Sequence, residues 1–538
     1  MSGPSGGSVW GISSLGSRVS GQPIWSLMKY TVAIMEQTPE QNTVLARVSE
    51  LVRNKYFTMA REVLNRELAE DPANIPLRVK LVEIYNEIRD FQEACRLLTE
   101  LLVEVPDNDR LFSLYPQVLL GAGRPDEGIE RALELQERLG KGSFHALGLL
   151  AELYETTSRT DDLRELVDRM APKGPVEELI RDYSRARLLL RDKEYESAVQ
   201  LFDEIRTRLD ADSHVGEDIR LTRMVDCGFQ MCKAYDRMGD YDSAWAAATR
   251  AHQDHQAALP SNFSSEEYRQ NLESIMELMD KETLASLAHA QEDLEWEPLY
   301  IVGNPRSGTS LLEQILSMHP DIANGGEMSI SLRLMEDLPR LTDSYHGWPN
   351  SVLDMQVGDA NALGRMYMSA LAHFSAGKKI VSNKALNLQA QLGFLSLVTP
   401  NAKAIMLYRY PLDNCVSCYT TNLLTSGHLY CSDLDELANV WLARRKIMEH
   451  WFDRIEMPLM ELHYEGLVQN QEYETRRLIE FLGLEWDESC LEFYKSKFVA
   501  RTISYDQVNR KMYTTSDGRW KNYEKHLGPL ADKLSDYL

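Results

Sequence analysis

The chain has 538 residues, of which 43% are hydrophobic and 26% charged, and its formal net charge is −24. Because one hydrophobic core rarely organises a chain of this length, two or three domains are expected. The acidic balance argues against a nucleic-acid or anionic-membrane partner, and the lack of an apolar run of ~18 residues argues against membrane insertion.

Residues 1–44 are expected to form a disordered leader. The first 28 are rich in glycine and serine and lack the basic start and apolar block of a secretory signal. Met28 and Met35 are candidate translation starts, and the true start stays open. Seven cysteines, an odd number in a long chain without such a signal, predict reduced thiols and a cytoplasmic location.

Cys415 and Cys418 form a C-x-x-C pair within the C-terminal half. No second pair stands at metal-ligand spacing, so a zinc or redox role is disfavoured. The two thiols are interpreted as neighbours on one face of a helix.

Residues 45–255 carry a repeat with a period of 34 residues. Four positions return at that spacing, with Phe57, Ala60, Leu64 and Pro72 recurring as Phe91, Ala94, Leu98 and Pro106. The pattern blurs from 110 to 175 and returns near Tyr195 and Tyr241. A small residue where two helices cross and a proline that ends the second helix are typical of tetratricopeptide repeats. We therefore predict a helical solenoid of about six helix pairs, whose concave groove could hold a protein partner.

Residues 256–297 are interpreted as a helical linker, and residues 298–538 as an α/β domain. In the latter, short apolar runs alternate with helical patterns. The candidate parallel strands are 299–302, 379–382, 403–408 and 459–463. This alternation predicts a three-layer domain with a parallel sheet whose ligands lie at the carboxyl ends of the strands.

The first candidate strand leads into a glycine loop. Gly303 and Gly308 precede Thr309 and Ser310, which is the spacing of a phosphate-binding loop with threonine in place of the usual lysine. Backbone N–H groups and the following helix N-terminus favour an anion there. Because the missing lysine normally reaches the β and γ phosphates, its loss favours a nucleotide without a γ-phosphate. Arg306 would supply the charge within the loop.

The string Pro-Arg-Ser-Gly-Thr at 305–309 resembles the phosphosulfate-binding loop of sulfotransferases that use 3′-phosphoadenosine 5′-phosphosulfate. From about residue 45 the chain resembles the tetratricopeptide-repeat-containing sulfotransferases, and its C-terminal part is more distantly similar to protein-tyrosine sulfotransferases. The resemblance implies a P-loop-type sulfotransferase domain with the phosphosulfate as co-substrate and no metal. The implied donor-binding loop residues are Arg306, Ser307, Gly308, Thr309 and Ser310.

Two further cations follow strands. Arg409 directly follows the third candidate strand, and Ser417 lies about two turns into the next helix. An arginine and a hydroxyl so placed can hold one phosphate, and the resemblance assigns them the 3′-phosphate. Lys384 follows the second strand and, in the family, neutralises charge on the leaving oxygen. The family usually has aspartate where this chain has Asn383.

Glu327 is the predicted general base. It follows Gly325 and Gly326, and the resembling sulfotransferases carry a Gly-Glu pair here whose glutamate takes the proton of the acceptor hydroxyl. A partly desolvated carboxylate can perform this step. His319, at the end of the loop helix, is a rival base and is ranked second as a helix cap.

The resemblance also implies nucleotide contacts nearer the C-terminus. They are Tyr464 after the fourth strand, and Ser504, Gln507, Arg510 and Arg519 in a segment that covers the nucleotide. Which of Asn509, Arg510 and Lys511 reaches the cofactor stays open.

The predicted activity is sulfuryl transfer to an acceptor hydroxyl or amine, with Glu327 as base and with Arg306 and Lys384 stabilising the departing bisphosphate. The acceptor (peptide, glycan, lipid or small molecule) and the oligomeric state stay open. A P-loop kinase or NTPase is a first alternative, disfavoured by Thr309. A second alternative is a repeat-based protein-interaction scaffold with an inactive nucleotide-binding domain.

Overall fold

The structure is a computed structural model that describes residues 39–53, 57–88, 90–211, 215–258, 263–292, 294–424, 427–496, 511–512 and 515–538. Residues 1–38 of the expected leader lie outside these ranges. Helix α1 starts at Pro39, so it already includes residues 39–44 of that predicted segment.

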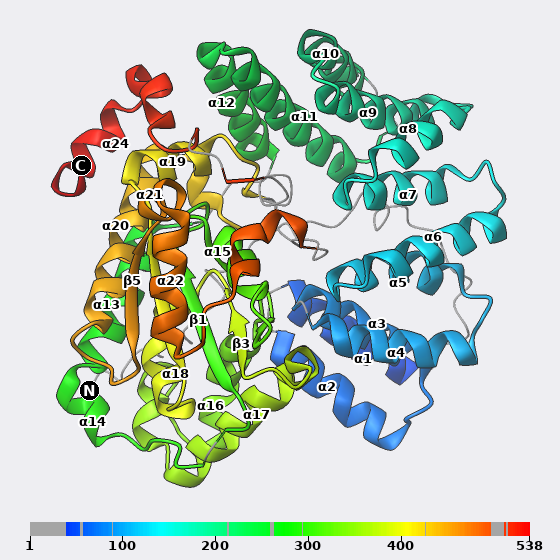
Figure 1. Ribbon diagram of the computed structural model, residues 1–538. Helices are drawn as coiled ribbons and strands as arrows, with labels where there is room; N and C mark the ends of the chain where they lie inside the picture. Colours follow the sequence, from blue (N-terminus) through cyan, green and yellow to red (C-terminus); the bar gives the residue numbers. More distant parts are fainter. Residues whose placement is uncertain are drawn as a thin grey trace, which may run out of the picture.

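The described part of the N-terminal half is helical, and each helix packs against the next in chain order. Figure 1 shows these helices as an arc along one side of the C-terminal half. They are α1 (Pro39–Arg53), α2 (Phe57–Glu70), α3 (Ile75–Glu87), α4 (Phe91–Glu104), α5 (Asp109–Gly121), α6 (Pro125–Leu139), α7 (Phe144–Thr156), α8 (Thr160–Arg169), α9 (Pro175–Arg191), α10 (Tyr195–Ala211), α11 (Glu217–Met238) and α12 (Tyr241–Ala258).

The predicted repeat is visible in the packing of these helices. Ala60 and Ala94 have no exposed surface. Gly128 stands at the equivalent position of the next repeat, 34 residues after Ala94. A Cβ at Gly128 would meet the carbonyl oxygen of Pro116 at 2.8 Å, so helices α5 and α6 approach too closely for a side chain there. The prediction of tetratricopeptide-like helix pairs is therefore confirmed, including the stretch where the residue pattern blurs.

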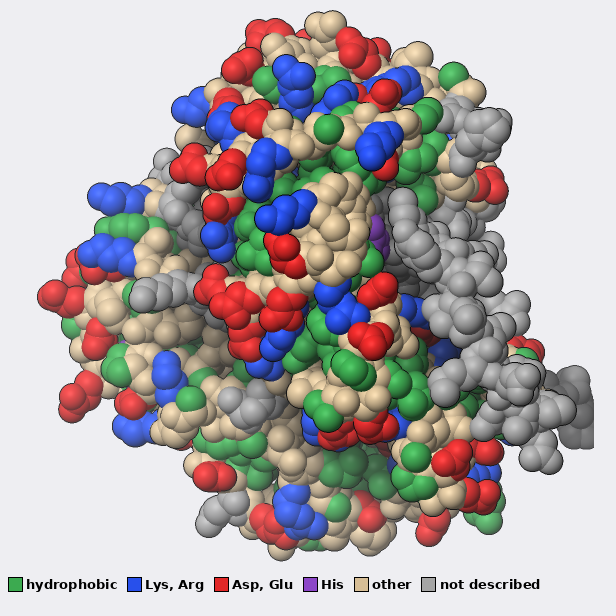
Figure 2. All heavy atoms as spheres, turned by 90° about the vertical axis from the view of Figure 1, so that its right-hand side faces the viewer, with side chains coloured by type: hydrophobic (Ala, Val, Ile, Leu, Met, Phe, Trp, Pro, Cys, Tyr) green, Lys and Arg blue, Asp and Glu red, His purple; other side chains and the backbone are tan. Residues whose placement is uncertain are grey.

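The outer face of the helical arc carries acidic and basic side chains interspersed with each other (Figure 2). Ion pairs one turn apart recur on it, for example between Arg96 and Glu100 at 2.6 Å. Such exposed pairs add little stability individually. Among the described residues, no helix has both the length and the apolar character needed to cross a bilayer.

Two helices join the arc to the C-terminal half: α13 (Ser265–Leu278) and α14 (Lys281–Ser286). The Ser264 side chain accepts a hydrogen bond from the backbone N–H of Glu267, which caps α13 at the position that the sequence indicates. Helix α13 then packs along α20 (Leu434–Trp451), so the predicted linker contributes to the core of the next domain.

The C-terminal half contains a five-stranded parallel sheet with the order β2-β3-β1-β4-β5. Its strands are β1 (Glu297–Gly303), β2 (Ile322–Asn324), β3 (Ile380–Asn383), β4 (Lys403–Tyr408) and β5 (Leu459–His463). Four of them confirm the predicted strands, and β2 is an additional strand of three residues. Because all five run parallel, their carboxyl ends lie along one edge.

Helices cover both faces of the sheet, as the prediction of a three-layer domain requires (Figure 1). They are α15 (Thr309–Ser317), α16 (Ile330–Leu341), η3 (Asn350–Asp354), α17 (Val357–Ser375), η4 (Leu388–Ala390), α18 (Leu392–Val398), α19 (Pro411–Tyr419), η6 (Leu429–Ser432), α20, α21 (Tyr464–Gln469), α22 (Gln471–Leu482), η7 (Glu488–Lys495), η8 (Arg519–His526), α24 (Gly528–Lys533) and η9 (Ser535–Tyr537).

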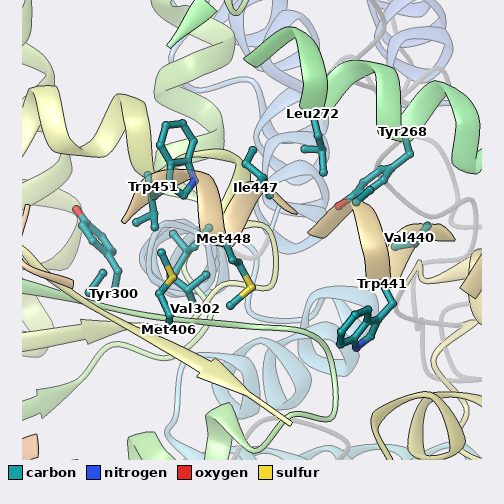
Figure 3. Packing of buried hydrophobic residues seen from close by; sticks show 14 of the residues in the cluster. Tyr268, Leu272, Tyr300, Val302, Met406, Val440, Trp441, Ile447, Met448 and Trp451 are labelled. Carbon is teal, nitrogen blue, oxygen red and sulfur yellow. The ribbon is translucent and has the colours of Figure 1, made fainter. Parts of the chain in front are cut away.

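Alternate residues of β1 enter two separate cores, as the period of a strand requires. Tyr300 and Val302 pack with Trp451 and Met448 of α20 in the larger core (Figure 3). Leu299 and Ile301 pack on the other face, against α15 and α22. A strand that is buried on both faces explains why this run reads as continuously apolar.

The helical arc contacts the α/β domain at both of its ends. Near the N-terminal end, Arg333 of α16 pairs with Asp90 at 2.8 Å. Near the other end, Trp245 of α12 stacks on Tyr419 of α19, with ring centroids 4.4 Å apart. The two halves of the chain therefore form one packed unit.

Candidate active site

The glycine loop connects β1 to α15 and has no room for side chains at its two glycines. A Cβ at Gly303 would meet the Ser307 Oγ at 2.5 Å and the Leu407 carbonyl oxygen at 2.9 Å. Gly308 has a φ of 103° and precedes the first residue of α15. A Cβ on it would meet the Tyr464 ring at 2.6 Å. The loop is therefore a close-fitting backbone turn at a helix N-terminus, which suits an anion.

Arg306, inside this loop, has a φ of 65°, the left-handed region that residues with a side chain rarely adopt. Such backbone strain is concentrated at functional sites. The Arg306 Nε donates to the Ser417 Oγ at 3.2 Å. The structure thus brings together the loop arginine and the hydroxyl that the sequence paired with Arg409.

Arg409 leaves the end of β4 and contacts the same loop. Its Nη1 donates to the Arg306 carbonyl oxygen at 2.8 Å, and its Nη2 to the Ser516 carbonyl oxygen at 2.7 Å. The guanidinium carbon lies 4.7 Å from the centre of the Tyr464 ring, a distance typical of a cation–π contact. Tyr464 itself is buried at the start of α21. Arg306, Arg409, Ser417 and Tyr464 therefore form one cluster around the loop.

The predicted base and the predicted catalytic lysine are in direct contact. Lys384 Nζ donates to Glu327 Oε1 at 2.9 Å. The Lys384 side chain is 5% exposed and that of Glu327 is 21% exposed, so the carboxylate is the partner that solvent or a substrate can reach. The Lys384 backbone N–H also donates to the Gly326 carbonyl oxygen at 2.9 Å.

A second carboxylate, which the sequence analysis did not single out, completes this group. Glu313 of α15 is 2% exposed, and its Oε2 lies 3.9 Å from Lys384 Nζ. Its Oε1 accepts from the Gly326 backbone N–H at 3.0 Å and from the Ser382 hydroxyl at 2.9 Å. Burial raises the pKa of Glu313, against the opposing effects of Lys384 and of these two hydrogen bonds.

Asn383 stands where the family usually has aspartate. Its side chain connects the turn that carries Glu327 to helix α17. Its Oδ1 accepts from the Met328 backbone N–H at 3.2 Å, and its Nδ2 donates to the Tyr367 hydroxyl at 3.1 Å. An amide can accept and donate in this way at one position. The departure from the family pattern thus has a structural reason here.

The rival base, His319, contacts two backbone groups. Its Nε2 donates to the Glu485 carbonyl oxygen at 2.8 Å, and its Nδ1 accepts from the Asp321 backbone N–H at 3.1 Å. Both ring nitrogens of this buried side chain are therefore engaged by backbone groups.

Arg519 is directed away from the loop. Its Nη2 donates to Asp236 Oδ1 of α11 at 2.7 Å, and the Tyr523 hydroxyl donates to the same oxygen at 2.6 Å. The structure thus places this predicted cofactor residue in an ion pair between the two halves of the chain. Its neighbours Gly518 and Trp520 donate backbone N–H groups to Asp413 at 2.7 Å each.

Ser504, Gln507, Asn509 and Arg510 lie outside the described residues. Lys511 is described, and its Nζ lies 5.5 Å from the centre of the Tyr494 ring. All seven cysteines are buried and free of disulfides. Cys415 and Cys418 lie on α19, where the sequence analysis places them, and the Cys418 thiol donates to the Pro305 carbonyl oxygen at 3.4 Å.

A cavity of about 490 Å³ opens beside Arg409. Its lining includes Tyr410 and Trp520, whose ring centroids are 5.8 Å apart. The Asp413 carboxylate, which holds the Gly518–Trp520 turn, lines it as well. The cavity therefore lies between the ends of β4 and β5 and the C-terminal segment.

Residues 298–488 match the sequence model of the Sulfotransferase family. The matched segment contains Arg306, Glu327, Lys384 and Arg409, and it ends before Arg519.

Three relatives are similar to parts of the chain. An uncharacterized protein of Aquifex aeolicus is 26% identical over 84% of this chain and 58% of its own length. Protein-tyrosine sulfotransferase A of Caenorhabditis elegans is 24% identical over 39% of this chain and 56% of its own length. Protein-tyrosine sulfotransferase 1 of Danio rerio is 26% identical over 39% of this chain and 60% of its own length. The chain thus spans little more than half the length of these relatives.

Two solved structures are similar to parts of the chain. The sulfotransferase domain of the Synechococcus PCC 7002 olefin synthase covers 43% of this chain and 90% of its own, with 17% identity and a TM-score of 0.32. PilW, a type IV pilus biogenesis factor, covers 42% of this chain and 96% of its own, with 16% identity and a TM-score of 0.32.

Proposed function

Because the C-terminal domain belongs to the sulfotransferase family, we propose that this protein transfers a sulfuryl group from 3′-phosphoadenosine 5′-phosphosulfate to an acceptor hydroxyl or amine. The observation that carries the proposal is the contact between Arg306 Nε and Ser417 Oγ at 3.2 Å. It joins the loop suited to the 5′-phosphosulfate to the hydroxyl suited to the 3′-phosphate, so both ends of one nucleotide have partners within a single cluster.

The residues present fit such a donor. The loop backbone is a cradle that a Cβ at Gly303 or Gly308 would fill, and Arg306 and Arg409 supply charge beside it. The chain has a net charge of −24, yet Arg306 lies within this loop and Arg409 contacts it from the end of β4. Arginine pairs with phosphate oxygens through two parallel N–H donors, which suits the bisphosphate product as well as the donor.

In the proposed reaction, Glu327 accepts the proton of the acceptor hydroxyl. The acceptor oxygen forms a bond to sulfur while the bond between sulfur and the 5′-phosphate oxygen breaks. The electron pair of that bond leaves with adenosine 3′,5′-bisphosphate, whose charge the loop N–H groups, Arg306 and Lys384 stabilise. Lys384 donates a hydrogen bond to Glu327. An anion that enters the site therefore competes with the Glu327 carboxylate for the Lys384 ammonium.

The acceptor is proposed only by chemical class, as a hydroxyl or amine on a peptide, glycan, lipid or small molecule. We also propose a cytoplasmic location, which seven free thiols support. The groove of the helical arc remains a candidate site for a protein partner.

The test is calorimetry of the full chain with adenosine 3′,5′-bisphosphate and with AMP, followed by transfer of labelled sulfuryl group into metabolite and peptide extracts. We expect the bisphosphate to bind at least tenfold more tightly than AMP, because it alone reaches Arg409 and Ser417. Equal affinities would contradict the proposal. No binding of either nucleotide would support the alternative of a repeat-based scaffold, and tight ATP binding that requires Mg²⁺ would support a kinase.

A further inference from the structure

We infer that Glu313 is a positioning residue of the proposed transfer reaction. Its buried carboxylate, held on the helix that follows the glycine loop, fixes the turn that carries Glu327 and the ammonium of Lys384. The inference rests on the proposed function and adds a residue to its machinery.

Three donors from two separate segments converge on this carboxylate. Glu313 Oε1 accepts from the Gly326 backbone N–H at 3.0 Å and from the Ser382 hydroxyl at 2.9 Å, and Oε2 faces Lys384 Nζ at 3.9 Å. Gly326 immediately precedes Glu327, and Ser382 lies two residues before Lys384. One side chain therefore contacts the supports of both the base and the cation.

The turn before Glu327 is tightly constrained on its other sides. A Cβ at Gly325 would meet the Ser382 carbonyl oxygen at 2.2 Å, and Gly326 has a φ of 72°. The Gly325 backbone N–H donates to the same carbonyl at 3.1 Å. The turn is thus held against β3 on one side and by Glu313 on the other, and removing Glu313 would release the side that faces α15.

The position of Glu313 on α15 links the base to the donor loop. Helix α15 begins at Thr309, directly after Gly308, and Glu313 is four residues further along, one helical turn above the loop. The loop that would grip the donor and the carboxylate that holds the base turn therefore belong to one short rigid element. The separation of donor and base is set by this helix and not by a flexible connection.

A buried carboxylate is costly unless it has partners, and a neutral side chain could fill the same space. Glu313 has a charged partner in Lys384, which it shares with the more exposed Glu327. When an anion competes with Glu327 for the Lys384 ammonium, Glu313 still holds that ammonium from its other side. This division leaves Glu327 to accept a proton while Lys384 stays in place.

The experiment compares Glu313→Gln, Glu313→Ala and the control Gln314→Ala in the full chain. Gln314 is equally buried on the same helix, but its Nε2 donates to the Phe493 carbonyl oxygen at 3.0 Å, away from the base turn. Turnover is measured with labelled donor and p-nitrophenol as acceptor. Bisphosphate affinity is measured by calorimetry, and backbone hydrogen exchange is measured over residues 322–328.

Glutamine can still accept from Gly326 and Ser382 but lacks the charge, so Glu313→Gln should lower kcat about tenfold with an unchanged exchange rate. Alanine removes both interactions, so kcat should fall about 100-fold, as for a misplaced catalytic group, and exchange over 322–328 should rise. The bisphosphate Kd should stay within about twofold in both variants, and Gln314→Ala should change none of these values.

The two proposals fail in different ways. An unmodified protein that neither binds the bisphosphate nor transfers label overturns the proposed function and the inference with it. An active protein whose Glu313 variants keep its kcat and its exchange rates overturns the positioning role alone, as does an equal loss in Gln314→Ala. If p-nitrophenol is not an acceptor, faster exchange in Glu313→Ala but not in Gln314→Ala supports the positioning role, and unchanged exchange overturns it.

Discussion

Lys384 Nζ donates a 2.9 Å hydrogen bond to Glu327 Oε1, so the two groups expected to act on opposite sides of the transferring sulfur are paired with each other. Lys384 is almost fully buried and Glu327 is partly exposed. The lysine is therefore the fixed partner, and the carboxylate is the one that can turn toward an acceptor.

Glu327→Gln should lower kcat by about 10²–10⁴-fold, because a neutral amide cannot accept the proton of the acceptor hydroxyl. Bisphosphate affinity should be retained, because glutamine fills the same space as glutamate and proton transfer is not part of nucleotide binding. Turnover with labelled donor and calorimetry measure the two effects. His319→Gln is the control for the rival base, and a larger loss of turnover there than in Glu327→Gln would reverse the assignment.

Lys384→Met should destabilise the fold by roughly 3–5 kcal/mol, because it leaves the buried Glu313 carboxylate without its cation. The double variant Lys384→Met with Glu313→Gln should recover most of that stability, since no buried charge remains, yet it should stay inactive. Urea unfolding measures stability and labelled-donor turnover measures activity. A double variant that is no more stable than the single one would show that the two side chains do not depend on each other.

Arg409→Ala should weaken adenosine 3′,5′-bisphosphate binding by about 10–100-fold, the loss of about 1.5–3 kcal/mol of charged hydrogen bonding, and AMP binding by much less. Calorimetry with both ligands gives the ratio, and Arg477→Ala on the exposed face of α22 is the matched control. Arg409 also holds the Arg306 carbonyl oxygen. Equal losses for the two ligands would assign Arg409 to shaping the loop and not to the 3′-phosphate.

The features that could be predicted from the sequence are those that depend on residues close together in the chain. Gly303 and Gly308 are glycines because the Leu407 carbonyl oxygen and the Tyr464 ring leave no room for a Cβ, and such restrictions appear directly as a motif. The strands at 403–408 and 459–463 are continuous or alternating apolar runs of ordinary length, and they were predicted to the residue. The repeat was visible because four residue types recur at a spacing of 34, as Ala60 does at Ala94.

The features that escaped prediction depend on contacts between distant segments. Strand β2 has three residues, too few for any periodicity. Glu313 lies three residues before Leu316 on the apolar stripe of α15, and this placement was the one local sign that its carboxylate is buried. Arg519 pairs with Asp236, 283 positions earlier, and nothing near either residue indicates this contact.

Arg519→Met should lower the free energy of unfolding by about 1–3 kcal/mol, the value of a charged hydrogen bond, and leave the bisphosphate Kd within about twofold. The reason is that its guanidinium is bonded to Asp236 of α11 and lies between the two halves of the chain. Chemical unfolding and calorimetry measure the two quantities, with the exposed neighbour Asn522→Ala as control. Unchanged stability together with weaker bisphosphate binding would contradict this prediction. It would indicate that Arg519 contacts the nucleotide, as the family resemblance implies.

Acid should weaken the contact between the helical arc and the α/β domain through His252. This buried imidazole donates from Nε2 to the Tyr419 carbonyl oxygen at 2.9 Å, and burial lowers its pKa from 6.5 to about 4. Because the folded pKa lies below the unfolded one, the neutral form is favoured in the folded protein. Its stabilisation is complete above pH 6.5 and is lost as the pH falls toward 4, by about 3 kcal/mol in total at about 1.4 kcal/mol per pH unit.

The variant His252→Gln tests this, since glutamine can still donate to the Tyr419 carbonyl oxygen but does not titrate. Urea unfolding of both proteins is measured between about pH 7.5 and about pH 4, a range that spans the unfolded and folded pKa of His252. It gives the difference in stability between the two proteins as a function of pH. We expect the variant to be the less acid-sensitive of the two over this window, and the carboxylates that titrate in both proteins cancel in the difference. Parallel curves would show that folding leaves the pKa of His252 unchanged, so that the junction between α12 and α19 tolerates the charged ring.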